Sequence, residues 1–308
     1  MTYFSIVIPY VLWMLAYMLT GFGIVKAGWA ETPHARSLSG ILIYVCGPAM
    51  FINAFQRMPY DPAQFRSIAL FFLVTLAIQA AVIGLMCMLL HRRFDNARYR
   101  ILSISTVLGN VGFLGLPLVT ALFPHAPIVA CYSTVYALSM NLVVFTLGVF
   151  LLTRDKKYMS LRAAILNPTS LAILFALPFY LLDIHLPGAI LDNLALLGHM
   201  STPMCMFVLG MRLAAADLKA LFTRPYAYIG SLLKLIAYPL AAYLMVRFLP
   251  GLDSTFKTCV LVLSAAPSGA IILSLAELHR CEQENAASVL LMSTLLCAAT
   301  IPLVMLVL

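Results

Sequence analysis

Charged residues are scarce in this sequence. Only 10% of its 308 residues are Asp, Glu, Lys or Arg, whereas 63% are hydrophobic. A soluble domain carries roughly a quarter charged residues, so this composition excludes an ordinary soluble protein. The apolar runs are continuous and long enough to cross a bilayer as helices. They lack the period-two alternation of β-barrel strands. The composition therefore predicts an all-α integral membrane protein.

The sequence also lacks the usual patterns of enzyme and metal chemistry. Its seven cysteines are scattered, mostly within apolar runs, and form no CxxC or Cys/His spacing. We interpret them as small packing residues. There is no hydrolase elbow, phosphate-cradling glycine loop or paired-carboxylate site. We therefore expect no enzyme activity, no metal and no other cofactor.

Acidic residues are missing from the centres of the apolar runs. All eleven Asp and Glu residues lie in connections or near the ends of runs. This distribution disfavours a proton relay through a central carboxylate and a sodium site with a central carboxylate ligand. Glu277 comes nearest to an exception, either as a helix-end charge or as a residue of a cavity. Sodium coordination by carbonyls and hydroxyls alone stays open.

The apolar runs predict ten membrane-spanning helices joined by short connections. Their predicted bounds are 3–25, 38–56, 67–90, 99–123, 127–153, 164–182, 187–211, 225–246, 254–278 and 285–308.

The basic residues predict which way these spans run. Most of the 19 Lys and Arg residues fall in alternate connections, beginning with the one after the first span. The positive-inside rule places those connections in the cytoplasm and both termini on the other side of the cytoplasmic membrane. No basic leader precedes the first run, so we expect no cleavable signal peptide. The net charge of +8 reflects this topology, and we expect no nucleic-acid partner.

Two similar segments suggest an internal repeat. PAMFINAFQR at 48–57 and PMCMFVLGMR at 203–212 align Pro48 with Pro203 and Arg57 with Arg212. Each proline lies in the second span of a five-span half, which predicts repeats at 1–158 and 159–308. An odd number of spans gives the two halves opposite orientations, the inverted-repeat organisation of many secondary transporters.

Helix-breaking residues interrupt the fourth and ninth spans. GNVGFLGLPLV at 109–119 and SAAPSGA at 264–270 place glycine and proline near the centre of each span. These residues destabilise a helix interior by about 1 and 3 kcal/mol. Discontinuous helices at corresponding positions of two halves mark a transporter's substrate site. The predicted site residues are Asn110, Gly112, Gly115, Pro117, Pro267, Ser268 and Gly269.

These two motifs, in the fourth and ninth of ten spans, resemble the auxin efflux carrier family. The resemblance implies two inverted five-helix repeats whose fourth and ninth helices cross at mid-membrane. It identifies Asn110 with the family's crossover asparagine, and Pro117 and Pro267 with its crossover prolines. It also implies a dimerising scaffold of spans 1, 2, 6 and 7 and an elevator-like transport unit of spans 3–5 and 8–10. The short connection 154–162 fits a bacterial-type member related to malonate-type carriers.

A broken helix leaves backbone amides without partners, and their partial positive charge suits a carboxylate. Asn110 either donates a hydrogen bond to that anion or caps the freed backbone. Lys234 lies about 15 Å from either end of its span at helical rise, where an unpaired charge is costly. It is predicted to be an anion counter-charge or a substitute for a coupling ion, or else a lysine bonded to carbonyls of a broken helix.

Other polar residues near the span centres are weaker candidates for the cavity. They are Ser139, Asn141, His199 and Thr202, and each is also explained by a hydrogen bond between helices. Together the sequence predicts a secondary transporter of small carboxylates in the cytoplasmic membrane. A sodium-coupled carrier of the bile-acid symporter type is the second hypothesis. A channel or a ligand-binding membrane sensor is the hypothesis from another class.

Overall fold

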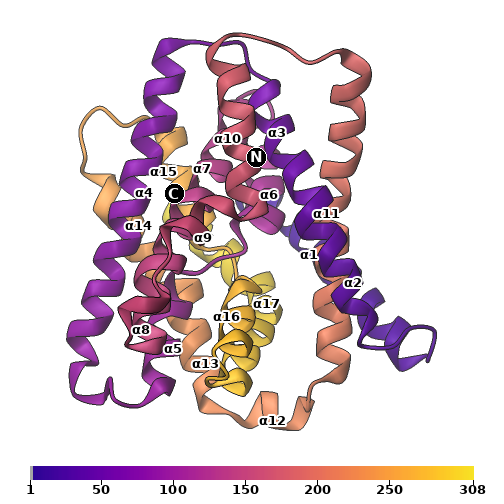
Figure 1. The fold of residues 1–308 in the computed structure, drawn as a ribbon, viewed down its shortest axis with the longest axis vertical. Coiled ribbons are helices and arrows are strands. Elements are labelled where there is room, and N and C mark those ends of the chain that lie inside the picture. Colours follow the sequence, from indigo (N-terminus) through magenta and orange to yellow (C-terminus); the bar gives the residue numbers. More distant parts are fainter. Residues whose placement is uncertain (1–2) are drawn as a thin grey trace.

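The computed structural model describes residues 3–308, and this part of the chain is helical throughout apart from its connections (Figure 1). Within residues 3–308, seven helices are long and apolar enough to cross a membrane, or eight if one bent pair counts as a single span. The prediction of an all-helical, multi-pass membrane protein is confirmed.

Four of the helices long and apolar enough to span lie in the first half of the described residues. The elements of this half are α1 (Tyr3–Lys26), α2 (His34–Ile41), η1 (Leu42–Cys46), α3 (Gly47–Gln56), α4 (Pro62–Leu89), α5 (Ala97–Val107), η3 (Val111–Gly115), α6 (Leu116–Leu122), α7 (Ile128–Val143), η4 (Val144–Gly148) and α8 (Val149–Thr153). Short 3-10 turns, η2 (His91–Arg93) and η5 (Lys156–Tyr158), lie in connections.

The second half of the chain follows from Leu161 onward. Its elements are α9 (Leu161–Leu166), α10 (Pro168–Leu181), α11 (Gly188–Ala215), α12 (Leu218–Thr223), α13 (Pro225–Leu232), η6 (Leu233–Ala237), α14 (Tyr238–Arg247), α15 (Ser254–Ser264), α16 (Ile271–Leu278), α17 (Gln283–Val304) and η7 (Met305–Val307).

The fourth and ninth predicted spans do not reach spanning length as single helices. The fourth is divided into α5 and the η3–α6 segment, and the ninth into α15 and α16. The divisions fall at Leu108–Asn110, where the first helix-breaking motif begins, and at Ala265–Ala270, within the second. Both breaks therefore lie where the glycine and proline pattern predicts them.

The sixth predicted span is bent, which the sequence interpretation missed. The helical segments Lys156–Leu166 and Pro168–Leu181 meet at 45°. Asn167 sits at the bend in an extended conformation, and its side-chain oxygen accepts a hydrogen bond from the amide of Ser170. Proline disfavours helical geometry in the residue before it and is well placed in the first turn of a new helix.

Three of the four π-helical turns precede a proline. η1, η3 and η6 are followed two residues later by Pro48, Pro117 and Pro239. Proline has no amide hydrogen, and its ring clashes with the carbonyl four residues earlier. A wider turn before the proline accommodates that carbonyl, and such π turns occur often at functional sites.

The long helices pack closely where glycine faces a neighbouring backbone. A Cβ added at Gly21 of α1 would lie 2.2 Å from the carbonyl oxygen of Phe207, and one at Gly210 of α11 would lie 1.9 Å from that of Met18. Small residues of this kind let helices approach each other in membranes. α1 and α11 accordingly lie side by side, and α11 also packs on α3 (Figure 1).

Candidate functional site at the meeting of two broken helices

The two breaks meet and pair their backbones. The amide of Asn110 donates to the carbonyl of Pro267 at 2.7 Å, and the amide of Gly269 donates to the carbonyl of Leu108 at 3.2 Å. Gly109 and Ser268 thus form an isolated antiparallel bridge. A buried backbone group without a partner costs several kcal/mol in an apolar medium. Each break therefore supplies hydrogen-bond partners for the other.

Glycine makes this close approach of two backbones feasible. A Cβ added at Gly269 would lie 3.1 Å from the carbonyl oxygen of Gly109. One added at Gly109 would lie 3.0 Å from Nζ of Lys234 and 3.4 Å from the carbonyl oxygen of Ala266. A side chain at Gly269 would press on the backbone of the first break, whereas one at Gly109 would first displace the end of Lys234.

A cavity of about 340 Å³ lies beside the paired breaks. It is lined by Gly109–Phe113 from the first break and by Gly269–Ile271 from the second. Ala270 and Ser274 also line it and are exposed, so the cavity is not enclosed by the protein. Of the predicted site residues, four belong to the lining: Asn110, Gly112, Gly269 and Asn141.

Both helix starts at the breaks border this cavity. The η3–α6 segment begins at Val111 and α16 begins at Ile271. The first amides of a helix have no partner within it, and they carry the positive end of the helix dipole. The arrangement brings two such ends to one cavity and favours negative charge there.

Asn110 faces the cavity without capping the helix that follows it. The structure shows no side-chain cap at the start of η3, although Asn110 holds the cap position. The side chain is almost buried, and Nδ2 contacts Sγ of Cys205 on α11 at 3.4 Å. Thiol sulfur is a weak acceptor, so the amide group keeps most of its hydrogen-bonding capacity.

Gly112 and Gly269 lie in the lining, whereas the other predicted motif residues, Gly115, Pro117, Pro267 and Ser268, lie outside it. A Cβ added at Gly112 would lie 2.9 Å from the ring of Phe51. One added at Gly115 would lie 2.8 Å from a methyl group of Leu263. Pro117 lies in the first turn of α6. Ser268 is fully buried. Its amide donates to Oγ of Ser293, and its own hydroxyl has no partner among the described residues.

Lys234 lies behind the crossing rather than in the described cavity lining. It is fully buried in η6, and its Nζ donates to the carbonyl of Ser264 at 2.9 Å. Ser264 is the last residue of α15, where the helix dipole is negative. The ammonium also lies 4.6 Å from the ring centre of Tyr238, an arrangement that favours a cation. This contact matches one of the alternatives drawn from the sequence, a lysine bonded to a carbonyl of a broken helix.

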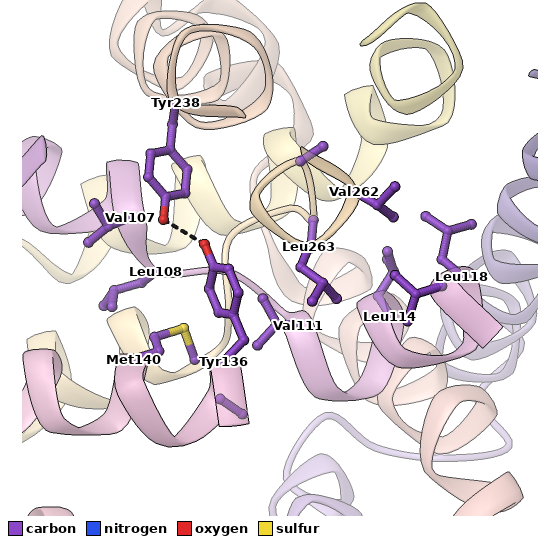
Figure 2. Packing of buried hydrophobic residues seen from close by; sticks show 14 of the residues in the cluster. Val107, Leu108, Val111, Leu114, Leu118, Tyr136, Met140, Tyr238, Val262 and Leu263 are labelled. Atoms are coloured by element: carbon purple, nitrogen blue, oxygen red, sulfur yellow. Dashed lines mark hydrogen bonds between the residues drawn. The ribbon is translucent and has the colours of Figure 1, made fainter. Parts of the chain in front are cut away.

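Tyrosine and aliphatic side chains seal the same side of the crossing. The hydroxyl groups of Tyr136 on α7 and Tyr238 on α14 share a hydrogen bond of 2.6 Å. Figure 2 shows this pair among Leu108, Val111 and Met140, next to the break. The sulfur of Met140 accepts from the amide of Gly109 at 3.3 Å. The tyrosine pair thus packs behind the crossing, while Val111 and Met140 also border the cavity.

The weaker candidates divide between the cavity and the helix contacts. Asn141 lines the cavity, and its Nδ2 donates to Oδ1 of Asn167 at the bend between α9 and α10. Ser139 is buried away from the lining, where its hydroxyl accepts from Gln79 at 2.8 Å. Thr202 donates to the carbonyl of Phe113 at 2.6 Å and so joins α11 to η3. His199 is on an exposed face of α11.

Arg212 is a cavity residue that the sequence analysis used for the repeat alignment and for membrane topology, but not as a site residue. Among the described lining residues it is the one charged side chain. Its Nη1 lies 3.9 Å from Oε1 of Glu277 on α16, and its Nε is buried without a hydrogen-bond partner among residues 3–308. The alignment of Arg212 with Arg57 does not indicate a cavity residue, because Arg57 is exposed and its Nε donates to Oδ1 of Asn53.

The described residues contain no group of three or more His, Cys, Asp or Glu side chains able to hold a metal ion. Five of the seven cysteines are buried and all seven are free, as expected for packing residues. The polar groups at the site are amides, hydroxyls and one guanidinium, a set suited to binding an organic ligand.

Comparison with known proteins then identifies the family. A family model described as a membrane transport protein matches residues 6–159 and 152–305. The chain belongs to this transporter family. The resemblance to auxin efflux carriers is therefore confirmed. An uncharacterized transporter of Methanocaldococcus jannaschii is 24% identical over 297 residues, covering 94% of this chain and 93% of that protein. The meeting of the broken helices is thus the candidate substrate site of a membrane transporter.

Proposed function

We propose that this transporter is a secondary carrier of small organic anions with a carboxylate group. The observation that carries the proposal is the convergence of two helix starts, at Val111 and Ile271, on one open cavity. Each end contributes roughly 0.3–1 kcal/mol toward an anion, and more where it is partly buried. The cavity volume of about 340 Å³ lies within the range of small-molecule sites.

The proposed fold has ten spans in two inverted repeats, 1–158 and 159–308. The two broken spans support it, since they occupy the fourth and ninth positions and pair with each other. In this proposal α1, α2–α3, α9–α10 and α11 form the scaffold, and the remaining spans form a transport unit that moves as an elevator. The packing of α1 on α11, and of α3 on α10 and α11, supports a separate scaffold group.

The structure corresponds, in this proposal, to a state open toward the cytoplasm. The cavity is lined by Ser39, Thr169 and Arg212, which lie near helix ends that lead into the predicted cytoplasmic connections. Those connections carry most of the basic residues. α12, which belongs to one of them, lies at the bottom edge of the molecule in Figure 1. The cytoplasmic membrane and outward-facing termini follow from the same charge pattern.

A homodimer through the scaffold is part of the proposal. The scaffold elements expose large apolar side chains, among them Trp13, Tyr44 and Phe175. Either lipid or a second copy of the chain can cover such an apolar surface. Mass measurement of the purified protein in lipid nanodiscs distinguishes the two, and a monomer at all concentrations would contradict the dimer.

Counterflow in proteoliposomes tests the proposed function. Vesicles loaded with unlabelled malonate, succinate or indole-3-acetate are expected to take up the matching labelled anion with saturable kinetics. A channel or a membrane sensor gives no such counterflow. Repeating the assay with sodium replaced by choline tests the sodium-coupled alternative, because a bile-acid symporter type of carrier would lose uptake. Absence of binding and exchange for every carboxylate would overturn the organic-anion proposal.

A further inference from the structure

Arg212 has hydrogen-bonding capacity that the described protein does not use. A guanidinium carries five N–H donors in a planar fork suited to a carboxylate. The structure records no hydrogen bond from Arg212, and its Nε is buried without a partner among residues 3–308. The side chain is 27% exposed and lines the open cavity at the meeting of the broken helices. A partly desolvated cation with unused donors at a cavity wall is suited to an anionic ligand.

The carboxylate of Glu277 does not satisfy this cation. The separation of 3.9 Å between Nη1 and Oε1 exceeds the 2.7–2.9 Å of a charge-assisted hydrogen bond. Glu277 is itself 53% exposed, so water hydrates its carboxylate. Two exposed surface pairs of this protein show the tighter geometry, with Arg154 and Asp95 at 2.7 Å and Arg224 and Glu284 at 2.7 Å. The guanidinium of Arg212 is therefore held near Glu277 but left free to bind elsewhere.

We propose that Arg212 binds the carboxylate of the transported anion and that Glu277 competes with the anion for it. The inference rests on the proposed organic-anion function and adds the residue that recognises the charge. With the cavity empty, Glu277 partly neutralises Arg212. When a ligand carboxylate enters the cavity, it accepts two parallel N–H···O bonds from the guanidinium of Arg212, and Glu277 turns to solvent.

This exchange has a consequence for movement. Arg212 lies on α11 and Glu277 on α16, so their ion pair links the proposed scaffold to the proposed transport unit. A ligand that takes Arg212 from Glu277 weakens that link as it binds. The same residue then recognises the anion and releases the helix that must move.

Binding measurements on the full-length protein in detergent test the inference. The probes are malonate, succinate and indole-3-acetate, each compared with its neutral amide. Arg212→Gln is expected to raise the Kd of the bound carboxylate about 10- to 100-fold, the range of a lost hydrogen bond to a charged group. It is expected to leave weak binding of the neutral amide unchanged. The Kd of Arg212→Lys for the carboxylate should fall between those of the wild type and Arg212→Gln. Arg57→Gln is the matched control, and its Kd should equal that of the wild type.

Glu277→Gln gives a result in the opposite direction. Loss of the competing carboxylate is expected to lower the Kd for the anion about threefold or more, equivalent to a surface ion pair. This variant keeps the test decisive even if Arg212→Gln does not fold. If the wild type binds a carboxylate, and Arg212→Gln binds it equally well or Glu277→Gln leaves the Kd unchanged, the role of Arg212 is wrong while the organic-anion function stands. If the wild type binds no probe, both proposals fail.

Discussion

At the scale of single residues, Asn110 shows how a helix break serves binding. An asparagine before a helix normally accepts a hydrogen bond from the first turn, which stabilises the helix. Here the side chain makes no such bond, and its one hydrogen bond among the described residues goes to the sulfur of Cys205. The amide therefore remains available to a ligand in the cavity that it lines.

Asn110→Ala is expected to weaken carboxylate binding with little loss of stability. Removal of one hydrogen bond to a charged carboxylate should raise the Kd about 10- to 100-fold. The melting temperature should change little, because only a weak contact to sulfur is lost. Isothermal titration and a thermal melt measure the two effects. Asn193→Ala, on the exposed side of α11, is the control and should alter neither. A large drop in melting temperature with an unchanged Kd would show that Asn110 is structural.

Lys234→Gln separates movement from binding. Since Lys234 is absent from the described cavity lining and bonds to Ser264, the Kd for a carboxylate should stay within about twofold of the wild type. The transport rate should fall about tenfold or more, because Nζ of Lys234 donates to the last carbonyl of α15 at the crossing. Proteoliposome uptake at several pH values measures the rate and tests the coupling role. Normal transport with unchanged pH dependence would contradict any such role for Lys234.

At the scale of elements, the two breaks are one structure built from distant segments. The bonds between Asn110 and Pro267 and between Gly269 and Leu108 close a short two-stranded pairing between helices. The glycine and proline content predicts that each helix breaks. The pairing itself is not visible in either motif, because it depends on how α5 and α15 are placed by the rest of the fold.

Gly269→Ala should destabilise the protein by separating the breaks. The new Cβ would press on the carbonyl of Gly109 at 3.1 Å, and overpacking of this kind costs about 1–3 kcal/mol. A thermal melt in detergent should show a lower melting temperature. Gly84→Ala is the matched control, because that glycine lies within α4 with open space beside it. Its melting temperature should stay the same or rise, in line with a helix propensity gain of about 1 kcal/mol. An equal response of both variants would show that the crossing tolerates a side chain.

Other elements mark the limits of sequence interpretation. The π turn at Leu233–Ala237 and the bend at Asn167 are local responses to proline that hydropathy does not report. Arg212 was counted with the basic residues that orient the chain, because it lies near the end of an apolar run. Its second role depends on the cavity that α11 forms with the breaks, which only the assembled helices define.

At the scale of the whole molecule, the charge pattern and the cavity point to the same face. The basic connections predicted to be cytoplasmic adjoin the helix ends that line the open cavity. This agreement allows the predicted orientation to be tested independently of transport.

Single cysteines introduced on the two faces should react from opposite sides. On a background with the seven native cysteines replaced, Lys219→Cys on α12 should label with a membrane-impermeant maleimide only in inverted vesicles. Leu249→Cys, in the connection between α14 and α15, should label only in intact cells. Both positions are exposed, so the membrane alone controls access to the reagent. The reverse pattern of labelling would invert the proposed topology.

The paired breaks also bear on how the chain is made. During synthesis the first half enters the membrane before Ala265–Ala270 is translated. The amide of Asn110 then lacks its acceptor, the carbonyl of Pro267. In lipid an unpaired backbone group is costly, and the first half on its own is left with that cost. We therefore expect the N-terminal half to stay only loosely assembled, and open to quality-control proteases, until the ninth span arrives. The last fifth of the chain decides when the protein becomes compact.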